Sequence, residues 1–103
     1  MKRFRIRTQP TAEAHLLAIA AWWEEHRPEH PDLVAEELAE AAQRLEGNPE
    51  AGAVVLSRRI VGVRRLLLPR SQYYLYYRVD HEKRVIRIEA VWHASRGKGP
   101  SLK

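Results

Sequence analysis

The sequence from Val63 to Arg96 decides the fold. It contains three short runs, VRRLLLP (63–69), YYLYYRVD (73–80) and VIRIEAVWHASR (85–96). Each run is rich in β-branched, leucine or aromatic residues and roughly alternates in polarity, which is typical of half-buried strands. The polar segment DHEKR at 80–84 predicts a hairpin turn. We therefore expect three consecutive antiparallel strands.

Alternation along the runs predicts which side chains share a face of the sheet. In the middle run, one face carries Tyr73, Leu75, Tyr77 and Val79, and the other carries Tyr74, Tyr76, Arg78 and Asp80. In the last run, the inward set is Ile86, Ile88, Ala90 and Trp92, and the outward set is Arg87, Glu89, Val91 and His93.

Upstream of these runs, the sequence predicts one strand and two helices. Phe4–Thr8 reads FRIRT and alternates like a strand. A helix follows over Thr11–His26, capped by Thr8 or Thr11 and ended by Arg27 before Pro28. Its apolar stripe is Ala12, Leu16, Ile19 and Trp23, widened by Leu17, Ala20 and Trp22.

A second helix is predicted from Pro31–Asp32, with Asp32 as N-cap, to a C-terminal Gly47. Its expected stripe is Ala35, Leu38, Ala42 and Leu45, with Glu36 and Glu37 placed to favour the helix dipole. Asn48–Arg59 is expected to be a loop with a short extended piece near Val54–Leu56. The fold class is therefore α+β, in the order β-α-α-β-β-β, with a helical hairpin packed on a small antiparallel sheet.

The composition fits one soluble domain. The chain has 103 residues, 45% of them hydrophobic and 30% charged, so we expect a single domain over 1–97 and a flexible tail over 98–103. It has no cysteine, which excludes disulfides, thiolate metal sites and cysteine nucleophiles and fits the cytoplasm. The N-terminus lacks the apolar core of a signal peptide, and no run is long enough to span a membrane.

The charge is unevenly distributed along the chain. The net charge is +5, yet the stretch Ala12–Ala51 holds ten acidic residues and only two arginines. The strand region is consequently basic, which indicates either an anionic partner, nucleic acid or an acidic protein segment, or a contribution to solubility alone.

Few residues carry a recognisable chemical motif. No glycine-rich phosphate loop or zinc-type spacing is present, so we expect neither a metal nor a cofactor. His93, at a strand end near Arg96, could serve as general acid or base in RNA cleavage, with the arginine stabilising phosphorane charge. It could equally be a contact residue, or bond to a neighbouring loop. The tyrosines of the middle run, flanked by arginines, are a weak signal for base stacking.

The ordered set of segments resembles the RelE/ParE superfamily of bacterial toxin–antitoxin toxins, closest to its ParE branch, over about residues 3–97. The similar segments are Ala12–Trp22, Leu45–Gly52, Gly62–Leu66, Tyr74–Asp80 and Val85–Arg96. His15 stands where an acidic residue is usual in the family.

The resemblance implies the toxin of a type II toxin–antitoxin pair, neutralised by a cognate ParD-like antitoxin. ParE-like toxins poison DNA gyrase, whereas RelE-like toxins cut mRNA in the ribosome. RelE-type cleavage uses basic residues where this chain reads Arg64, Leu66 and Tyr74, and a tyrosine that is absent after Arg96. This comparison favours gyrase inhibition by a toxin that needs no active site of its own.

The sequence is compatible with two alternatives to gyrase inhibition. The runner-up is a metal-independent, ribosome-dependent mRNA endoribonuclease that uses His93, Arg96 and Arg64. A binding module, or a toxin fold without toxicity, is the third. For a gyrase-binding toxin the resemblance places part of the target-binding surface at Trp92, His93, Ser95 and Arg96. It implies a hetero-oligomer with an antitoxin segment that is acidic and anchored by apolar residues, whose contact residues the sequence leaves unassigned.

Overall fold

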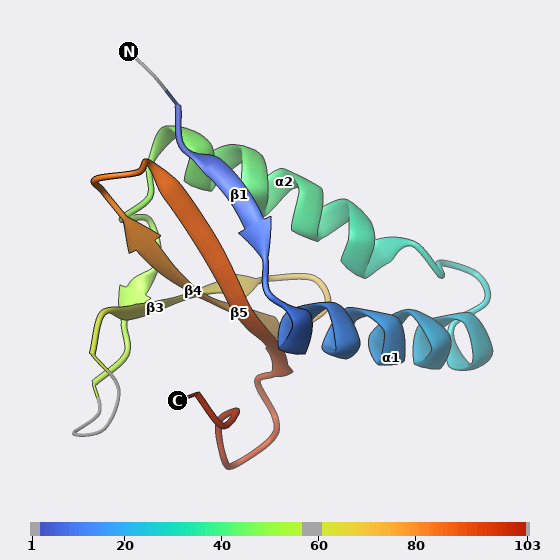
Figure 1. Ribbon diagram of the computed structural model, residues 1–103. Helices are drawn as coiled ribbons and strands as arrows, with labels where there is room; N and C mark the ends of the chain where they lie inside the picture. The colour runs from blue at the N-terminus through green and yellow to red at the C-terminus, as the bar shows by residue number, and fades with distance from the viewer. Residues whose placement is uncertain (1–2, 57–60, 103) are drawn as a thin grey trace.

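The computed structural model describes residues 3–56 and 61–102 as a two-layer α+β fold (Figure 1). The elements are β1 (Arg5–Thr8), α1 (Pro10–His26), α2 (Leu33–Gly47), β2 (Ala53–Val54), β3 (Val63–Leu68), β4 (Tyr73–Asp80) and β5 (Val85–His93). The predicted order is confirmed, and the short extended piece expected near Val54–Leu56 corresponds to the two-residue strand β2, which begins one residue earlier and ends at Val54. Residues 57–59 of that loop lie outside the described residues.

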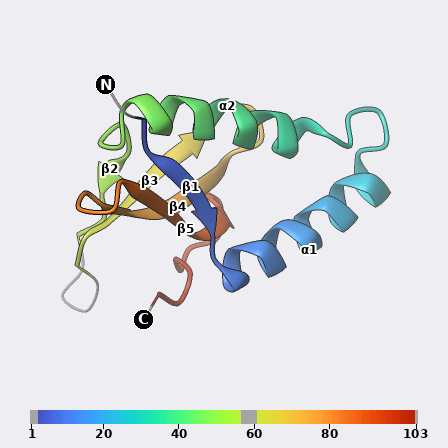
Figure 2. The same ribbon diagram turned by 45° about the horizontal axis from the view of Figure 1, so that its top comes forward.

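The sheet has the strand order β1-β5-β4-β3-β2 and is mixed (Figure 2). The three pairings among β2, β3, β4 and β5 are antiparallel as expected, but β1 runs parallel to β5. The expectation of a wholly antiparallel sheet was therefore wrong in this one pairing. Alternation encodes which face of a strand is apolar, but it does not encode which edge the strand joins or in which direction.

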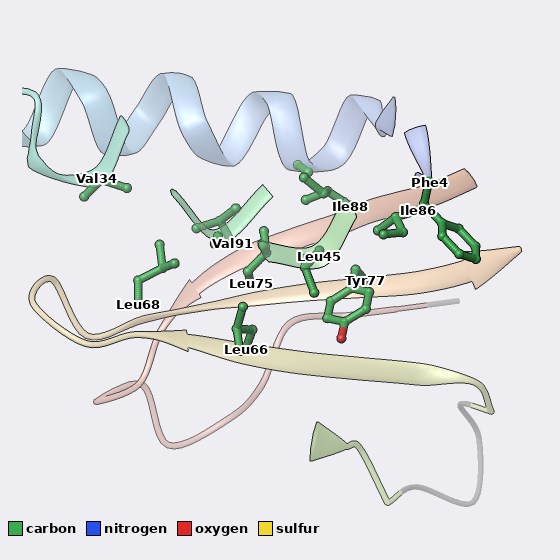
Figure 3. Close-up of a cluster of buried hydrophobic side chains, with 12 residues drawn as sticks. Phe4, Val34, Leu45, Leu66, Leu68, Leu75, Tyr77, Ile86, Ile88 and Val91 are labelled. Atoms are coloured by element: carbon green, nitrogen blue, oxygen red, sulfur yellow. The ribbon is translucent and has the colours of Figure 1, made fainter. Parts of the chain in front are cut away.

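The main core lies between the sheet and the two helices (Figure 3). Its fully buried members include Leu45, Leu75, Tyr77 and Ile86. On α1 the predicted stripe of Ala12, Leu16, Ile19 and Trp23 faces this core. The predicted widening of the stripe was wrong, since Leu17 is 75% exposed and Trp22 is 42% exposed. None of the described helices is long and apolar enough to cross a membrane.

The helix ends differ slightly from the prediction. Gln9, not Thr8 or Thr11, is the N-cap of α1, and Pro10 occupies the first turn, where its missing N–H costs nothing. Asp32 is the N-cap of α2 but makes no side-chain capping bond. Gly47 is still helical, and Asn48 is the C-cap.

The buried face of α2 is rotated from the predicted stripe. Ala35 is exposed, whereas Val34, Glu37 and Ala41 are buried with Leu45. Glu37, predicted near the N-terminal end of this helix where the dipole favours its charge, is only 2% exposed. Its carboxylate accepts hydrogen bonds from the backbone amides of Arg70 (2.7 Å) and Ser71 (2.9 Å) in the β3–β4 turn. The burial of Glu37 could not be predicted from the sequence, because its hydrogen-bond partners are backbone groups more than 30 residues away.

The exit from α2 is fixed by a tyrosine hydroxyl. Tyr77 is fully buried, donates its hydroxyl hydrogen to the Pro49 carbonyl (2.8 Å) and accepts from the Gly52 amide (2.9 Å). Burial raises the pKa of Tyr77, which keeps it a donor. A Cβ at Gly52 would lie 2.7 Å from both the Arg65 carbonyl and the Tyr77 hydroxyl, so this position requires glycine.

Gly52→Ala should therefore lower the free energy of unfolding by about 2 kcal/mol, since overpacking against backbone displaces the loop from β3. Urea unfolding followed by tryptophan fluorescence measures the effect. Gly97→Ala is the matched control, because a Cβ there meets nothing within 4 Å. Equal stability of the two variants would show that the loop yields without cost.

The C-terminal residues lie against the outer face of the sheet, which is the face opposite the helices. Trp92 Nε1 donates to the Lys98 carbonyl (2.7 Å), and Leu102 packs on a small cluster of Val63, Tyr76 and Ala90. The flexibility predicted for residues 98–103 concerns motion and stays a prediction, and Lys103 lies outside the described residues.

Candidate functional site

A β-bulge in β5 decides how the candidate residues point. Tyr77 pairs with Ile88 and Tyr76 with Ala90, so Glu89 has no partner on β4. The extra residue reverses the alternation beyond it. Ala90 and Trp92 therefore face outward and Val91 faces the main core, the opposite of the predicted assignment. A single unpaired residue cannot be recognised from an alternating pattern.

His93 lies at the end of β5 and is tied to its own turn. Its Nδ1 accepts the backbone N–H of Ser95 (3.1 Å) and lies 2.7 Å from the Ser95 hydroxyl. Because an amide only donates, Nδ1 carries no proton and the neutral ring has its hydrogen on Nε2. The ring also meets Tyr73 edge-on at 4.9 Å. To act as a base through Nδ1, His93 would have to break its hydrogen bonds with Ser95. The geometry therefore favours a role in contacting a partner over proton abstraction at that nitrogen.

Trp92 and Arg96 form the outward half of the strand end. The Arg96 guanidinium lies over the Trp92 ring, 4.1 Å from its centroid. The Arg96 backbone N–H donates to the His93 carbonyl (3.1 Å), which closes the turn after β5. The pair places a cation on a large aromatic surface that is only partly buried.

His15 on α1 connects the helix to this strand end. β1 ends opposite Ile88, so the later amides of β5 have no β1 partner. The Val91 N–H donates instead to His15 Nδ1 (3.3 Å), and the His15 ring lies 5.5 Å from Trp92. Burial, and then the positive charge of Arg96, lower the pKa of His15. This role of His15 could not be predicted from the sequence, because it depends on where β1 ends.

The pH dependence of stability tests this contact. With its pKa lowered by folding, His15 favours the folded state fully above its ordinary pKa of 6.5, and that contribution is lost as the pH falls from there through the folded pKa. His15→Gln should remove this part of the decline in unfolding free energy between about pH 7 and 5. The exposed His30→Gln variant is the control, and an identical decline in both variants would contradict the assignment.

Two shallow hollows meet at His93. One, of about 220 Å³, lies between α1 and the end of β5, and the other, of about 420 Å³, lies beside the β3–β4 turn. Their shared members are Trp22, Tyr73 and His93. We call the set of Trp22, Tyr73, Trp92, His93, Ser95 and Arg96 the contact surface. Aromatic and arginine side chains of this kind dominate protein–protein binding energy.

Arg64 does not belong to this surface. It lies on the helix-facing side of β3, and its guanidinium donates to the Gly52 carbonyl (2.8 Å) and approaches Glu50 (3.5 Å). Its partner on β4 is Tyr77, whereas that of His93 is Tyr73, a separation of about 13 Å along the strand. Arg64 therefore does not lie together with His93 and Arg96, the other two residues of the endoribonuclease alternative. Arg65, one of the arginines that flank the tyrosines of the middle run, faces outward, and its guanidinium lies 4.2 Å from the centroid of the Tyr74 ring.

A second surface is an apolar groove of about 450 Å³ between the helices. Its apolar lining comes from both helices and from Pro31 in their connection, and includes Leu16, Leu17, Ile19, Ala20, Trp23, Val34, Ala35 and Leu38. Leu17 and Ala35, predicted as core, line it as exposed residues. Within the described residues, no group of three His, Asp or Glu side chains is placed to hold a metal ion.

The fold is that of the RelE/ParE toxins. A chain from the chromosomal ParDE system of P. aeruginosa superimposes with a TM-score of 0.71 at 24% identity, covering 88% of this chain and 96% of that one. The RelBE2 toxin–antitoxin complex from Mycobacterium tuberculosis gives 0.62 at 25% identity, covering 92% and 95%. The intact E. coli RelBE complex gives 0.61 at 22% identity, covering 90% and 99%.

A family model described as the ParE toxin of the type II toxin–antitoxin system parDE matches residues 6–97. The chain therefore belongs to the ParE toxin family. No curated protein matches it.

Proposed function

We propose that this protein is the toxin of a type II pair, that it acts in the cytoplasm by inhibiting DNA gyrase, and that a ParD-like antitoxin neutralises it. The observation that carries the target assignment is the contact surface. It joins two tryptophans, a tyrosine and an arginine around small hollows, which suits the side chains of a protein target.

The arrangement gives less support to RNA cleavage. An endoribonuclease that splits phosphodiesters without a metal needs an acid, a base and a charge stabiliser around one phosphate. Here Arg64 is remote from His93, and the Nδ1 atom of His93 is engaged by Ser95.

The groove between the helices supports the antitoxin part of the proposal. The solved relatives from M. tuberculosis and E. coli are toxin–antitoxin complexes. An antitoxin segment is therefore the partner that we propose for this groove. Its apolar floor suits an amphipathic helix, and Glu13 and Asp32 at its margin disfavour acidic flanks. An acidic stretch of the antitoxin, as expected from the sequence, would suit the basic sheet better than this groove.

Assays with purified gyrase and plasmid DNA test the target. We expect the protein to inhibit supercoiling and to accumulate cleaved DNA that is released by detergent and protease. A double variant, Trp92→Ala with Arg96→Ala, should lose most of this effect, whereas Arg44→Gln on α2 should retain it. An unaffected gyrase together with mRNA cutting in a translating extract, abolished by His93→Ala, would establish the endoribonuclease instead. Inactivity in both assays would indicate a binding module.

A further inference from the structure

A row of arginines crosses the outer face of the sheet near the start of β5. Arg7 on β1 is paired directly with Arg87 on β5, and Arg87 is paired with Arg78 on β4. The three strands lie side by side in Figure 1, with a spacing of about 4.8 Å between neighbours. Like charges directly opposite each other destabilise a sheet. Positions that oppose folding in this way often have a function in binding.

The carboxylates nearby offset only part of this charge. Arg87 lies 3.5 Å from Asp80, and Arg78 lies 3.6 Å from Glu89. Arg5 and Arg7 are exposed, and neither forms an ion pair with any residue that the structure describes. These two side chains share the outer face because Ile6 between them packs into the main core.

The same side chains line a shallow hollow of about 300 Å³. Arg5, Arg7, Lys83 and Arg87 supply the cations, and we call these four residues the arginine patch. Thr8 and Gln9 add a hydroxyl and an amide at its margin. The only apolar member of the lining, Val85, is itself buried at 5% exposure.

The composition of the patch discriminates between anionic partners. A protein partner is normally held by an apolar or aromatic anchor, which this lining lacks. Single-stranded nucleic acid is normally held by aromatic rings on which bases stack, and the lining contains none. Guanidinium, ammonium, hydroxyl and amide donors spread over a two-dimensional face are instead the groups that contact the phosphates of a duplex.

We propose that the arginine patch binds the phosphate backbone of double-stranded DNA without reading its sequence. Each cation neutralises one phosphate and releases its condensed counterion, so about three to four contacts are available. The patch is separate from the contact surface and from the groove between the helices, since neither includes Arg5 or Arg7. An acidic stretch of the antitoxin is the competing occupant, and the competition with polyglutamate described below distinguishes it from DNA.

Salt-dependent binding of the full chain to a fluorescent 20-base-pair duplex tests the proposal. For the wild type we expect the logarithm of the affinity to fall with the logarithm of salt concentration with a slope of about −3. The double variant Arg5→Gln with Arg7→Gln should bind about tenfold or more weakly at 50 mM salt, with its slope reduced by about two. A control with the same change in net charge, Arg27→Gln with Arg44→Gln on the helical layer, should retain the wild-type slope.

Two further measurements keep the result decisive. Removing Arg7 relieves the opposed charges, so the patch variant should melt at or above the wild-type temperature in low salt, and the difference should disappear at 1 M salt. Equal loss of DNA binding in both double variants would show that net charge, and not the arginine patch, determines the affinity, and would overturn the proposal. So would the absence of duplex binding by the wild type, or displacement of the duplex by polyglutamate at a lower concentration of charges than unlabelled DNA requires.

Discussion

Replacing Glu37 with leucine should lower the free energy of unfolding by about 3 kcal/mol or more, because two buried backbone amides lose their acceptor. The amides of Arg70 and Ser71 shape the turn between β3 and β4, and in the described structure the Glu37 carboxylate accepts both. Leucine fills the space without accepting a hydrogen bond and keeps water out. Urea unfolding monitored by circular dichroism measures the loss.

Two comparisons separate this effect from a general charge effect. Glu37→Gln retains one acceptor oxygen and should be less destabilising than the leucine variant. Glu40→Ala removes an exposed carboxylate 3.5 Å from the same Arg70, and it should change stability by less than about 1 kcal/mol. A loss at Glu40 as large as that at Glu37 would show that the ion pairs of Arg70, and not the buried amides, hold the turn.

The decline of the unfolding free energy at acidic pH tests the same hydrogen bonds of Glu37. Burial alone would raise the pKa of Glu37, but the Ser71 hydroxyl, the two amides and the Arg70 guanidinium together hold it below its ordinary value of 4.5. Of these donors, the two amides have full hydrogen-bond geometry. The stabilisation is complete above 4.5 and is lost as the pH falls from there through the folded pKa. Glu37→Gln should therefore flatten this decline.

Leu17→Glu should weaken binding of the cognate antitoxin at least about 100-fold. The substitution removes a leucine from the groove and places an unpaired carboxylate there, a combined cost of about 3 kcal/mol in the complex. Free protein should fold normally, because Leu17 is 75% exposed and glutamate is a good helix former. Titration calorimetry with the cognate antitoxin gives the dissociation constant.

Ala14→Glu is the matched control for this prediction. It introduces the same side chain on α1 at an exposed position outside the groove. Gyrase inhibition by Leu17→Glu should persist, since Leu17 lies outside the contact surface, so co-expressed antitoxin should fail to rescue growth. Wild-type affinity of the Leu17→Glu protein would show that the antitoxin binds elsewhere, and it would leave the gyrase assignment intact.

Local patterns in the sequence predicted the layers of the fold. The 3–4 spacing of Ala12, Leu16, Ile19 and Trp23 predicted the buried face of α1, and the alternation in β4 predicted the two faces of that strand. Such patterns are reliable where each residue interacts with its own element and one neighbouring layer. Four members of the contact surface, Trp92, His93, Ser95 and Arg96, lie within five positions of the chain, so their proximity could be predicted, whereas Trp22 and Tyr73 come from other elements. Their role in target binding stays a prediction.

Features that depend on distant backbone could not be predicted. The bulge at Glu89 reversed which side of the sheet Ala90–His93 face. Because β1 ends opposite Ile88, the Val91 N–H is left to donate a hydrogen bond to His15. The separation of Arg64 from His93 followed from strand register. In each case the deciding partner is a backbone group or strand edge with no side-chain signature.

The sequence by itself determined the α+β class, the element order and the resemblance to ParE toxins, because periodicity and turn residues act locally. Only the tertiary structure decided that β1 is parallel to β5, that Glu37 is buried and that Arg7, Arg87 and Arg78 stand in a row. Those facts depend on register between strands far apart in the chain. Register is set by the packing of the whole core and not by any one segment.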